Sequence, residues 1–155
     1  NLVIPNTITQ IGDCQFMGFH QLKSITIPNG ITSIGASAFS GCYNRNLTNV
    51  EIPSSVISIS NAAFYNCVYL ETINIPNSIT NIGSSIFKYC SNLTSITIPE
   101  NVTNIGGQAF YECTSLETFN FAGTKAQWNS ITKGEDWNYK CPFTVVHCNN
   151  GDVSV

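Results

Sequence analysis

The chain has 155 residues, of which 43% are hydrophobic and only 10% are charged, and its formal net charge is -3. This is enough apolar material for one buried core, whereas six Lys and Arg residues cannot form the basic surface that nucleic-acid binding requires. No apolar run approaches the roughly 20 residues that cross a bilayer. We therefore expect neither a nucleic-acid partner nor membrane insertion for this stretch of sequence.

An Ile-Pro pair recurs along the chain. Its prolines are Pro5, Pro28, Pro53, Pro76 and Pro99, so the successive spacings are 23, 25, 23 and 23 residues. A nearly constant period of this size predicts a solenoid in which each repeat forms one coil. The longer spacing comes from two extra residues between Gly41 and Leu47, where a turn can be enlarged without changing the register of the other repeats.

Each repeat begins with the pattern Leu-x-x-Ile-x-Ile-Pro. Its apolar and polar residues alternate, as in residues 73–75, which predicts a short strand with one buried and one exposed face. The proline ends the strand because it has no N–H to donate to a neighbouring strand. The following Ile79-x-x-Ile82-Gly83 supplies two more inward residues, a glycine suited to a sharp bend, and the opposite wall of the coil.

The last part of a typical repeat reads x-x-Ala-Phe-x-x-Cys, with Ile86 in place of Ala in the fourth copy. Phe87 and Cys90 are three residues apart, so they share one face of a short helical turn. Stacked repeats join these apolar faces into one core. The predicted fold is a right-handed α/β repeat solenoid of about six 23-residue coils, with one parallel β-sheet and short helical turns.

The repeat decays after Phe121. Residues 1–121 contain five full repeats and the start of a sixth, and we expect residues 122–155 to form a degenerate last repeat and a C-terminal cap. Without a gap, Trp128 aligns with Ile105 of the preceding repeat. We expect a short helix containing Trp128 and Ile131, followed by a closing strand in CPFTVVHC.

The recurring I-P-x-x-(I/V)-x-x-I-G-x-x-A-F-x-x-C-x-x-L resembles the BspA-like class of leucine-rich repeats, from residue 2 to about residue 121. GTKAQWNSITKGEDWN resembles the C-terminal caps of bacterial members. Phe19 replaces the cysteine of the first copy, and Ser60 replaces the glycine of the third. The resemblance implies an extracellular or cell-surface bacterial protein, since members are typically surface or secreted proteins and some are implicated in adhesion to host matrix proteins.

Catalytic and metal-binding patterns are missing from the sequence. The cysteines that recur once per repeat, Cys42, Cys67, Cys90 and Cys113, are expected to be free and buried rather than metal ligands. Cys141 and Cys148 either pack in the cap or form a disulfide there. His147 is adjacent to Cys148 and would point to the opposite face, which disfavours a thiol–imidazole pair. We expect no enzyme activity, no catalytic residue, no metal and no cofactor.

The outward residues of the predicted strands form two rows across the coils. One row contains Thr26, Glu51, Asn74, Thr97 and Asn120, and the other contains Ser24, Asn49, Thr72, Ser95 and Thr118. This grid of hydroxyls and amides, with a single carboxylate, suits a protein or glycan ligand. The outward residues vary while the core residues beneath them are constant, which favours a binding module. A passive structural spacer within a larger surface protein remains the alternative.

Two other surfaces are candidates for contacts. Tyr65 and Tyr111 follow the inward phenylalanines on one flank, where their rings are either exposed anchors or lie over the neighbouring coil. The chain begins with Asn1 inside a running repeat, so we expect it to be a piece of a longer protein or a processed form. Its first coil is then uncapped, with free backbone groups at Leu2 to Ile4, which predicts end-to-end self-association or fraying.

Overall fold

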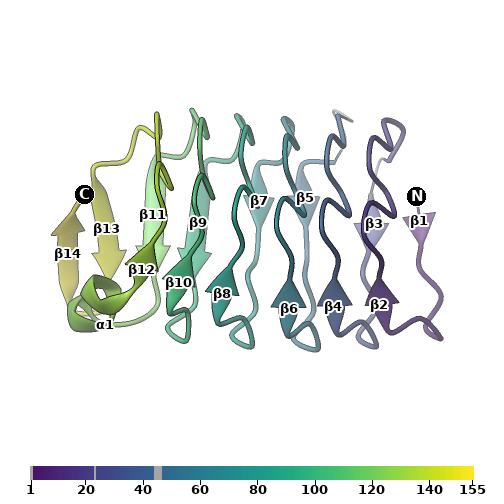
Figure 1. Ribbon diagram of the computed structural model, residues 1–155, viewed down its shortest axis with the longest axis horizontal. Coiled ribbons are helices and arrows are strands. Elements are labelled where there is room, and N and C mark those ends of the chain that lie inside the picture. Colours follow the sequence, from purple (N-terminus) through teal and green to yellow (C-terminus); the bar gives the residue numbers. More distant parts are fainter. Residues whose placement is uncertain (1, 23, 44–46) are drawn as a thin grey trace.

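The computed structural model describes residues 2–22, 24–43 and 47–155. It is a solenoid of about six coils with parallel strands, stacked from the N-terminal coil at one end to the C-terminal coil at the other (Figure 1). Each coil contributes one strand to each of two walls, which we call the first and second ladders. The predicted parallel solenoid is confirmed, and the second ladder is an addition, because the sequence predicted one sheet.

The first ladder contains the strands that precede the repeat prolines, and at its C-terminal end three further strands that no proline follows. They are β1 (Leu2–Val3), β3 (Ile25–Thr26), β5 (Asn49–Val50), β7 (Thr72–Ile73), β9 (Ser95–Ile98), β11 (Thr118–Phe121), β13 (Val145–Cys148) and β14 (Gly151–Ser154). Pairing is parallel except between β13 and β14, which are antiparallel. Among the described strands this ladder divides into three sheets, with interruptions between β3 and β5 and between β7 and β9.

The second ladder lies on the opposite wall. Its strands are β2 (Gln10–Ile11), β4 (Ser33–Ile34), β6 (Ser58–Ile59), β8 (Asn81–Ile82), β10 (Asn104–Ile105) and β12 (Thr132–Lys133). They pair as β2-β4-β6 and β8-β10-β12. Each strand is two residues long. The two inward apolar residues of each such segment, for example Ile79 and Ile82, are three residues apart, so the sequence lacks the alternation that predicts a strand. The neighbouring coil supplies the pairing instead.

Turns connect the second ladder to the next strand of the first ladder. The N–H of Phe39 donates to the carbonyl of Ala63 in the next coil at 2.8 Å, whereas the N–H of Ser40 donates to Ser37 at 3.1 Å. Two positions per coil, such as Ser85 and Tyr89 with φ of 55° and 65°, are left-handed. Because an α-helix cannot contain these conformations, the expected short helical turns are instead a series of hydrogen-bonded turns linked to the next coil.

Phenylalanines and cysteines fill the core beside these turns. Rings of Phe16, Phe39, Phe64, Phe87 and Phe110 stack in succession, with centroids 5.3, 5.3, 5.8 and 5.5 Å apart. The Cys90 thiol donates to the carbonyl of Phe64 at 3.2 Å, and burial raises the pKa of this thiol to about 12. All seven cysteines are free, and the four repeat cysteines are buried, as predicted.

The sixth coil contains a helix, and its residues do not align with those of the preceding repeat without a gap. Helix α1 (Lys125–Ser130) has Thr124 as its N-cap, and the side chain of Thr124 forms a capping box with Gln127. The cysteine spacing across this coil, from 113 to 141, is 28 residues instead of 23. Lys133 therefore pairs with Ile105, and the predicted alignment of Trp128 with Ile105 is wrong.

Trp128 is buried, although it comes from α1 rather than from a strand. Its ring packs against Phe119 and Phe121 with centroids 5.7 and 5.5 Å away. The amino group of Lys133 lies 4.3 Å from the centre of the Trp128 ring and donates to the carbonyls of Trp128 and Ile131. Partial burial lowers the pKa of Lys133. The lysine thus closes the C-terminal end of α1.

Cys141 continues the cysteine column of the repeats. Its thiol donates to the carbonyl of Phe110 at 3.0 Å, as the other column cysteines donate to the preceding phenylalanine. Cys148 lies in β13 opposite Phe121, and both thiols are free, so the disulfide alternative is wrong in this structure. Because coils continue past residue 121, the boundary between repeats and cap at that residue stays a prediction.

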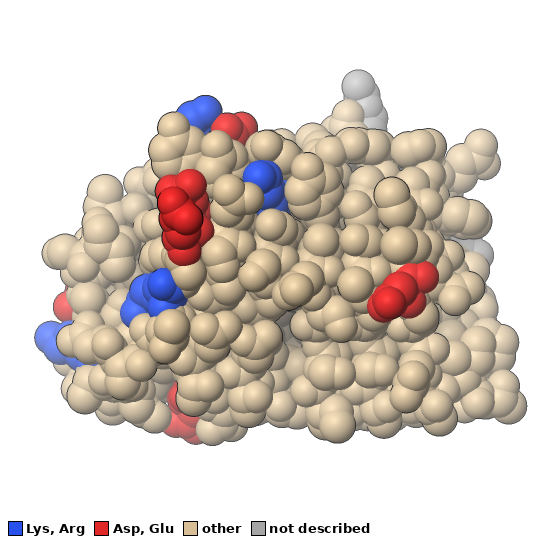
Figure 2. Space-filling model, viewed as in Figure 1, with Lys and Arg blue, Asp and Glu red and all other residues tan. Residues whose placement is uncertain are grey.

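Charged side chains are sparse on the side of the second ladder. Figures 1 and 2 view the molecule from this side, and most of the Lys, Arg, Asp and Glu residues visible there lie over the C-terminal coils. Among the described residues, no helix has the length and apolar character needed to span a bilayer. In the same residues, no cluster of His, Cys, Asp and Glu has an arrangement suited to a metal ion.

Candidate binding face

The outward residues of the first ladder form the predicted rows where the strands are paired. Asn49 lies opposite Thr72, and Ser95 lies opposite Thr118. Thr97 lies opposite Asn120. The two interruptions of the ladder divide this face into segments, and a hollow opens at each of them.

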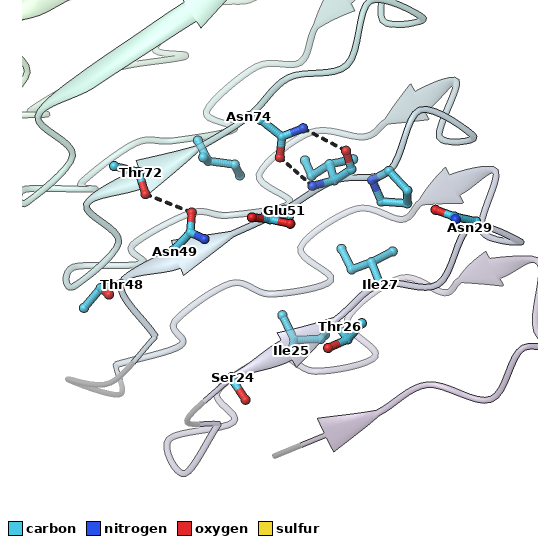
Figure 3. Close-up of a pocket in the computed structure, with 13 residues that line it drawn as sticks. Ser24, Ile25, Thr26, Ile27, Asn29, Thr48, Asn49, Glu51, Thr72 and Asn74 are labelled. Carbon is cyan, nitrogen blue, oxygen red and sulfur yellow. Dashed lines mark hydrogen bonds between the residues drawn. The ribbon is translucent and has the colours of Figure 1, made fainter.

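The first hollow opens between β3 and β5, on the second and third coils, and has a volume of about 1040 Å³ (Figure 3). Six of the ten predicted face residues line it: Ser24, Thr26, Asn49, Glu51, Thr72 and Asn74. The same two coils remain paired on the second ladder, where Ser33 lies opposite Ser58. The hollow is therefore a wedge between coils that separate on one wall only.

The longer second repeat lies beside this wedge. Its two extra residues fall between Gly41 and Leu47, directly before β5, and residues 44–46 of that turn lie outside the described residues. β5 nevertheless begins at Asn49, the repeat position at which β7, β9 and β11 also begin, so the insertion shifts the start of no strand. The second hollow opens between repeats with the usual 23-residue spacing.

The first hollow has an apolar floor and a polar rim. Ile25 is only half-buried there, whereas the equivalent Val50 and Ile96 of other coils are buried at 2% exposure each. Hydroxyl, amide and carboxylate groups surround this floor, as Figure 3 shows. The hollow thus offers both an apolar contact and hydrogen-bonding groups to a ligand.

The second hollow lies between β7 and β9 and has a volume of about 240 Å³. Four predicted residues line it, namely Thr72, Asn74, Ser95 and Thr97. Its other lining residues include Ile73, Ile96 and Pro99, and none of its lining residues is charged. Thr118 and Asn120, the remaining predicted residues, belong to the continuous sheet of β9, β11 and β13 and line neither hollow.

Some of the predicted face residues form hydrogen bonds with other residues of the protein. The Asn74 side chain accepts from the N–H of Ile52 at 2.7 Å and donates to the carbonyl of Ile52 at 2.8 Å. The Thr72 hydroxyl donates to Asn49 Oδ1 at 2.8 Å. Asn74 therefore joins the third coil to the fourth, and only part of its amide remains for a ligand.

Glu51 differs from its neighbours in the first hollow. Within the described residues, its side chain has neither a hydrogen bond nor an ion pair, and no other carboxylate lines the hollow. Among the described residues that line this hollow, Glu51 supplies the only charge, and that charge is negative. A cationic ligand group would complement it.

Two further residues, which were not predicted from the sequence, extend the outward row. His147 lies opposite Asn120, and its Nδ1 is 3.0 Å from Asp152 Oδ1 on β14. The alternation in the segment VVHC could have identified His147, but the antiparallel return that brings Asp152 beside it has no repeat to indicate it.

The tyrosine flank is a column of mutually packed rings. Tyr89 lies between Tyr65 and Tyr111, with centroids 5.6 and 5.9 Å away, and Tyr111 stacks on Tyr139 at 4.9 Å. The amino group of Lys88 is 4.4 Å from the centre of the Tyr111 ring. Tyr65 and Tyr111 are half-buried, so this geometry favours the alternative in which the rings lie over neighbouring coils.

Comparison with known proteins relates these repeats to one family. Residues 1–45 match the BspA type leucine rich repeat region. A leucine-rich repeat protein from Bacteroides ovatus has 26% sequence identity and a TM-score of 0.71 over 95% of this chain and 48% of its own. The leucine-rich repeat protein of T. pallidum has 28% identity and a TM-score of 0.70 over 87% of this chain and 68% of its own.

A leucine rich cell surface protein from Faecalibacterium prausnitzii has 27% identity and a TM-score of 0.56 over 84% of this chain and 50% of its own. The chain thus spans about half the length of the B. ovatus and F. prausnitzii proteins. A comparison with curated proteins found no match. The family match, the coil geometry and these neighbours together show that the repeats of this chain are leucine-rich repeats of the BspA type.

Proposed function

We propose that this chain is a non-catalytic module of a cell-surface or secreted bacterial protein and that the outer face of its first ladder binds a protein ligand. Leucine-rich repeat proteins generally bind proteins. The observation that carries the proposal is the pair of hollows, which open on this face among outward residues that vary over a constant core. The cell-surface name of the F. prausnitzii protein supports the location, and adhesion to a host matrix protein is the role we propose.

The proposed face favours many weak contacts. It presents hydroxyls and amides on a rigid framework, which lowers the ordering cost of binding. It lacks large aromatic anchors, so affinity per module should be micromolar or weaker, and useful strength requires several copies acting together. A glycan is the other ligand class that such a surface suits. A passive spacer would recognise neither class.

A screen against immobilised matrix proteins and a glycan array tests this proposal. We expect the chain to bind a matrix protein and the double variant Glu51→Lys, Thr97→Lys to bind at least about tenfold more weakly, because both hollows then carry a bulky cation. Ser58→Lys, on the exposed face of β6 in the second ladder, is the matched control and should bind as the parent does.

Three outcomes contradict the proposal. Equal binding by the folded double variant excludes the first-ladder face and directs attention to the tyrosine flank. Binding to glycans alone changes the ligand class. Binding to nothing in either collection favours the passive spacer.

The first coil is a candidate for a second contact surface, which would bind a copy of the same chain. Its exposed large hydrophobic side chains are Val3 at 78%, Ile8 at 40%, Met17 at 59% and Phe19 at 49% exposure. Among the described strands, β1 pairs only with β3, whereas α1 and β14 close the other end of the solenoid. We propose that two copies associate through their first coils, since an isologous contact buries this apolar patch on both partners.

Sedimentation over a range of concentrations tests this association. We expect a monomer–dimer equilibrium for the parent chain and a monomer for the variant Val3→Glu, Met17→Glu, because both charges would be buried at the contact. Tyr139→Glu, at the opposite end of the molecule and 46% exposed, should leave the equilibrium unchanged. A parent chain that stays monomeric at high micromolar concentration would contradict the proposal.

A further inference from the structure

The two hollows lie in sequence along the solenoid axis. They occupy the two interruptions of the first ladder, and the pair of strands β5 and β7 stands between them. Thr72, Ile73 and Asn74 line both, so the hollows share one wall. A single ligand that crosses the strands can therefore occupy both hollows.

The distance between the hollows restricts the conformation of such a ligand. The two interruptions are two coils apart, and paired parallel strands are about 4.8 Å apart, so the centres of the interruptions are separated by at least roughly 10 Å. An extended β-strand places side chains on one face about 6.6 Å apart, which is too short for this spacing. A polyproline II helix places every third side chain on one face at about 9 Å, which fits it.

The residues that line the hollows restrict which side chains of a ligand can enter them. The first hollow is large and contains the carboxylate of Glu51 without a partner among the described residues, so it suits the long basic side chain of Arg or Lys. The second hollow is smaller, uncharged and lined by Ile73, Ile96 and Pro99, so it suits a compact apolar side chain.

The rim between the hollows suits the backbone of the same ligand. A polyproline II segment has no internal hydrogen bonds, so its carbonyls accept from groups on a binding surface. Thr26 and Thr97, whose hydroxyls can donate to such carbonyls, line the first and the second hollow. A preformed ligand conformation also costs little ordering entropy.

We propose that this face binds a polypeptide segment in the polyproline II conformation that carries Arg or Lys three residues from an apolar residue. The inference rests on the proposed function and specifies its ligand. The basic side chain enters the first hollow beside Glu51, and the apolar side chain enters the second hollow. The same geometry accepts either order of the two residues along the ligand chain.

Fluorescent proline-rich peptides test the inference in solution by anisotropy. We expect saturable binding of a peptide containing Arg-Pro-Pro-Leu or Leu-Pro-Pro-Arg. Replacing its Arg by Glu should weaken binding by about tenfold or more, since like charges then meet at Glu51. Inserting a third proline between Arg and Leu should weaken it similarly, because the two side chains then point to different faces.

Variants of the protein test the assignment of each hollow. Glu51→Gln should weaken binding of the Arg peptide by about three- to fivefold, the upper part of the range for exposed ion pairs, and added salt should reduce this difference. Thr97→Lys should weaken binding of the same peptide, because the lysine side chain would occupy the second hollow. Glu135→Gln, an exposed carboxylate beyond β12 on the other side of the coil, is the matched control and should have no effect.

Failure of the inference is distinguishable from failure of the proposed function. Three outcomes would each overturn the inference. The first is that neither peptide binds, and the second is that peptides with two and with three prolines between Arg and Leu bind with equal affinity. The third is that Glu51→Gln binds the Arg peptide as tightly as the parent chain does. If a matrix protein then still binds through Glu51 and Thr97 in the screen, the proposed function stands and its ligand has another conformation. If neither the peptides nor a matrix protein binds through this face, both proposals are overturned.

Discussion

Replacing Phe87 by alanine is expected to lower the free energy of unfolding by about 3–5 kcal/mol, the usual cost of emptying a buried aromatic site. Phe87 is 0% exposed, and its ring stacks between Phe64 and Phe110 with centroids 5.8 and 5.5 Å away. The coils above and below cannot move into the space because each is fixed by backbone hydrogen bonds to its neighbours. The cavity therefore stays largely open.

Urea unfolding measures this effect, with Phe19→Ala as the matched control. Phe19 is 49% exposed on the first coil, so its replacement should cost less than about 1 kcal/mol. A denaturation midpoint that is the same for Phe87→Ala and the parent would show that the phenylalanine column does not stabilise the solenoid.

Replacing Gly106 by alanine is expected to cost about 1–3 kcal/mol, as overpacking does. A Cβ at this position would lie 2.5 Å from the backbone nitrogen of Ser84 and 2.7 Å from its Cα. These atoms belong to the preceding coil, so the two coils have to separate. Gly106 is therefore required for the close approach of its coil to the preceding one, and not only for a bend.

The same column supplies the control for this prediction. Gly12 occupies it in the first coil, where an added Cβ would have as its nearest neighbour the flexible Gln15 Oε1 at 3.3 Å. Gly12→Ala should change the free energy of unfolding by no more than about 0.5 kcal/mol. Equal midpoints for the two variants in thermal unfolding would contradict the role assigned to the coil contact.

The core of the fold is predictable because its residues recur at a fixed period. Each inward position, such as those of Ile73, Phe87 and Cys90, is repeated in several coils, so one pattern indicates the stacking of all of them. The second ladder was not predicted, since its two-residue strands depend on pairing between coils. The register of the sixth coil was wrong because Trp128 is an acceptable residue for an apolar column, which hid the five-residue difference between spacings of 28 and 23.

The candidate face is predictable in part. Alternation along the strands indicates which residues face outward, and the structure places Thr97 and Asn120 side by side as the sequence implied. The hollows depend on which neighbouring strands separate, and the repeat pattern does not indicate this, because β5, β7 and β9 begin at the same repeat position. The bonds of the Asn74 amide to Ile52 also depend on contacts between coils, so the ten residues as a binding site stay a prediction.

Hydrogen exchange with and without a bound ligand tests most directly whether the first-ladder face is the binding face. The ligand is the proline-rich peptide or a matrix protein from the screen. The backbone around the hollows, at residues 25–27, 49–53 and 72–75, should exchange more slowly in the complex. Residues of the second ladder, such as 58–59 and 81–82, should exchange at unchanged rates. Protection confined to the second ladder or to the turns that carry Tyr65 and Tyr111 would contradict the account.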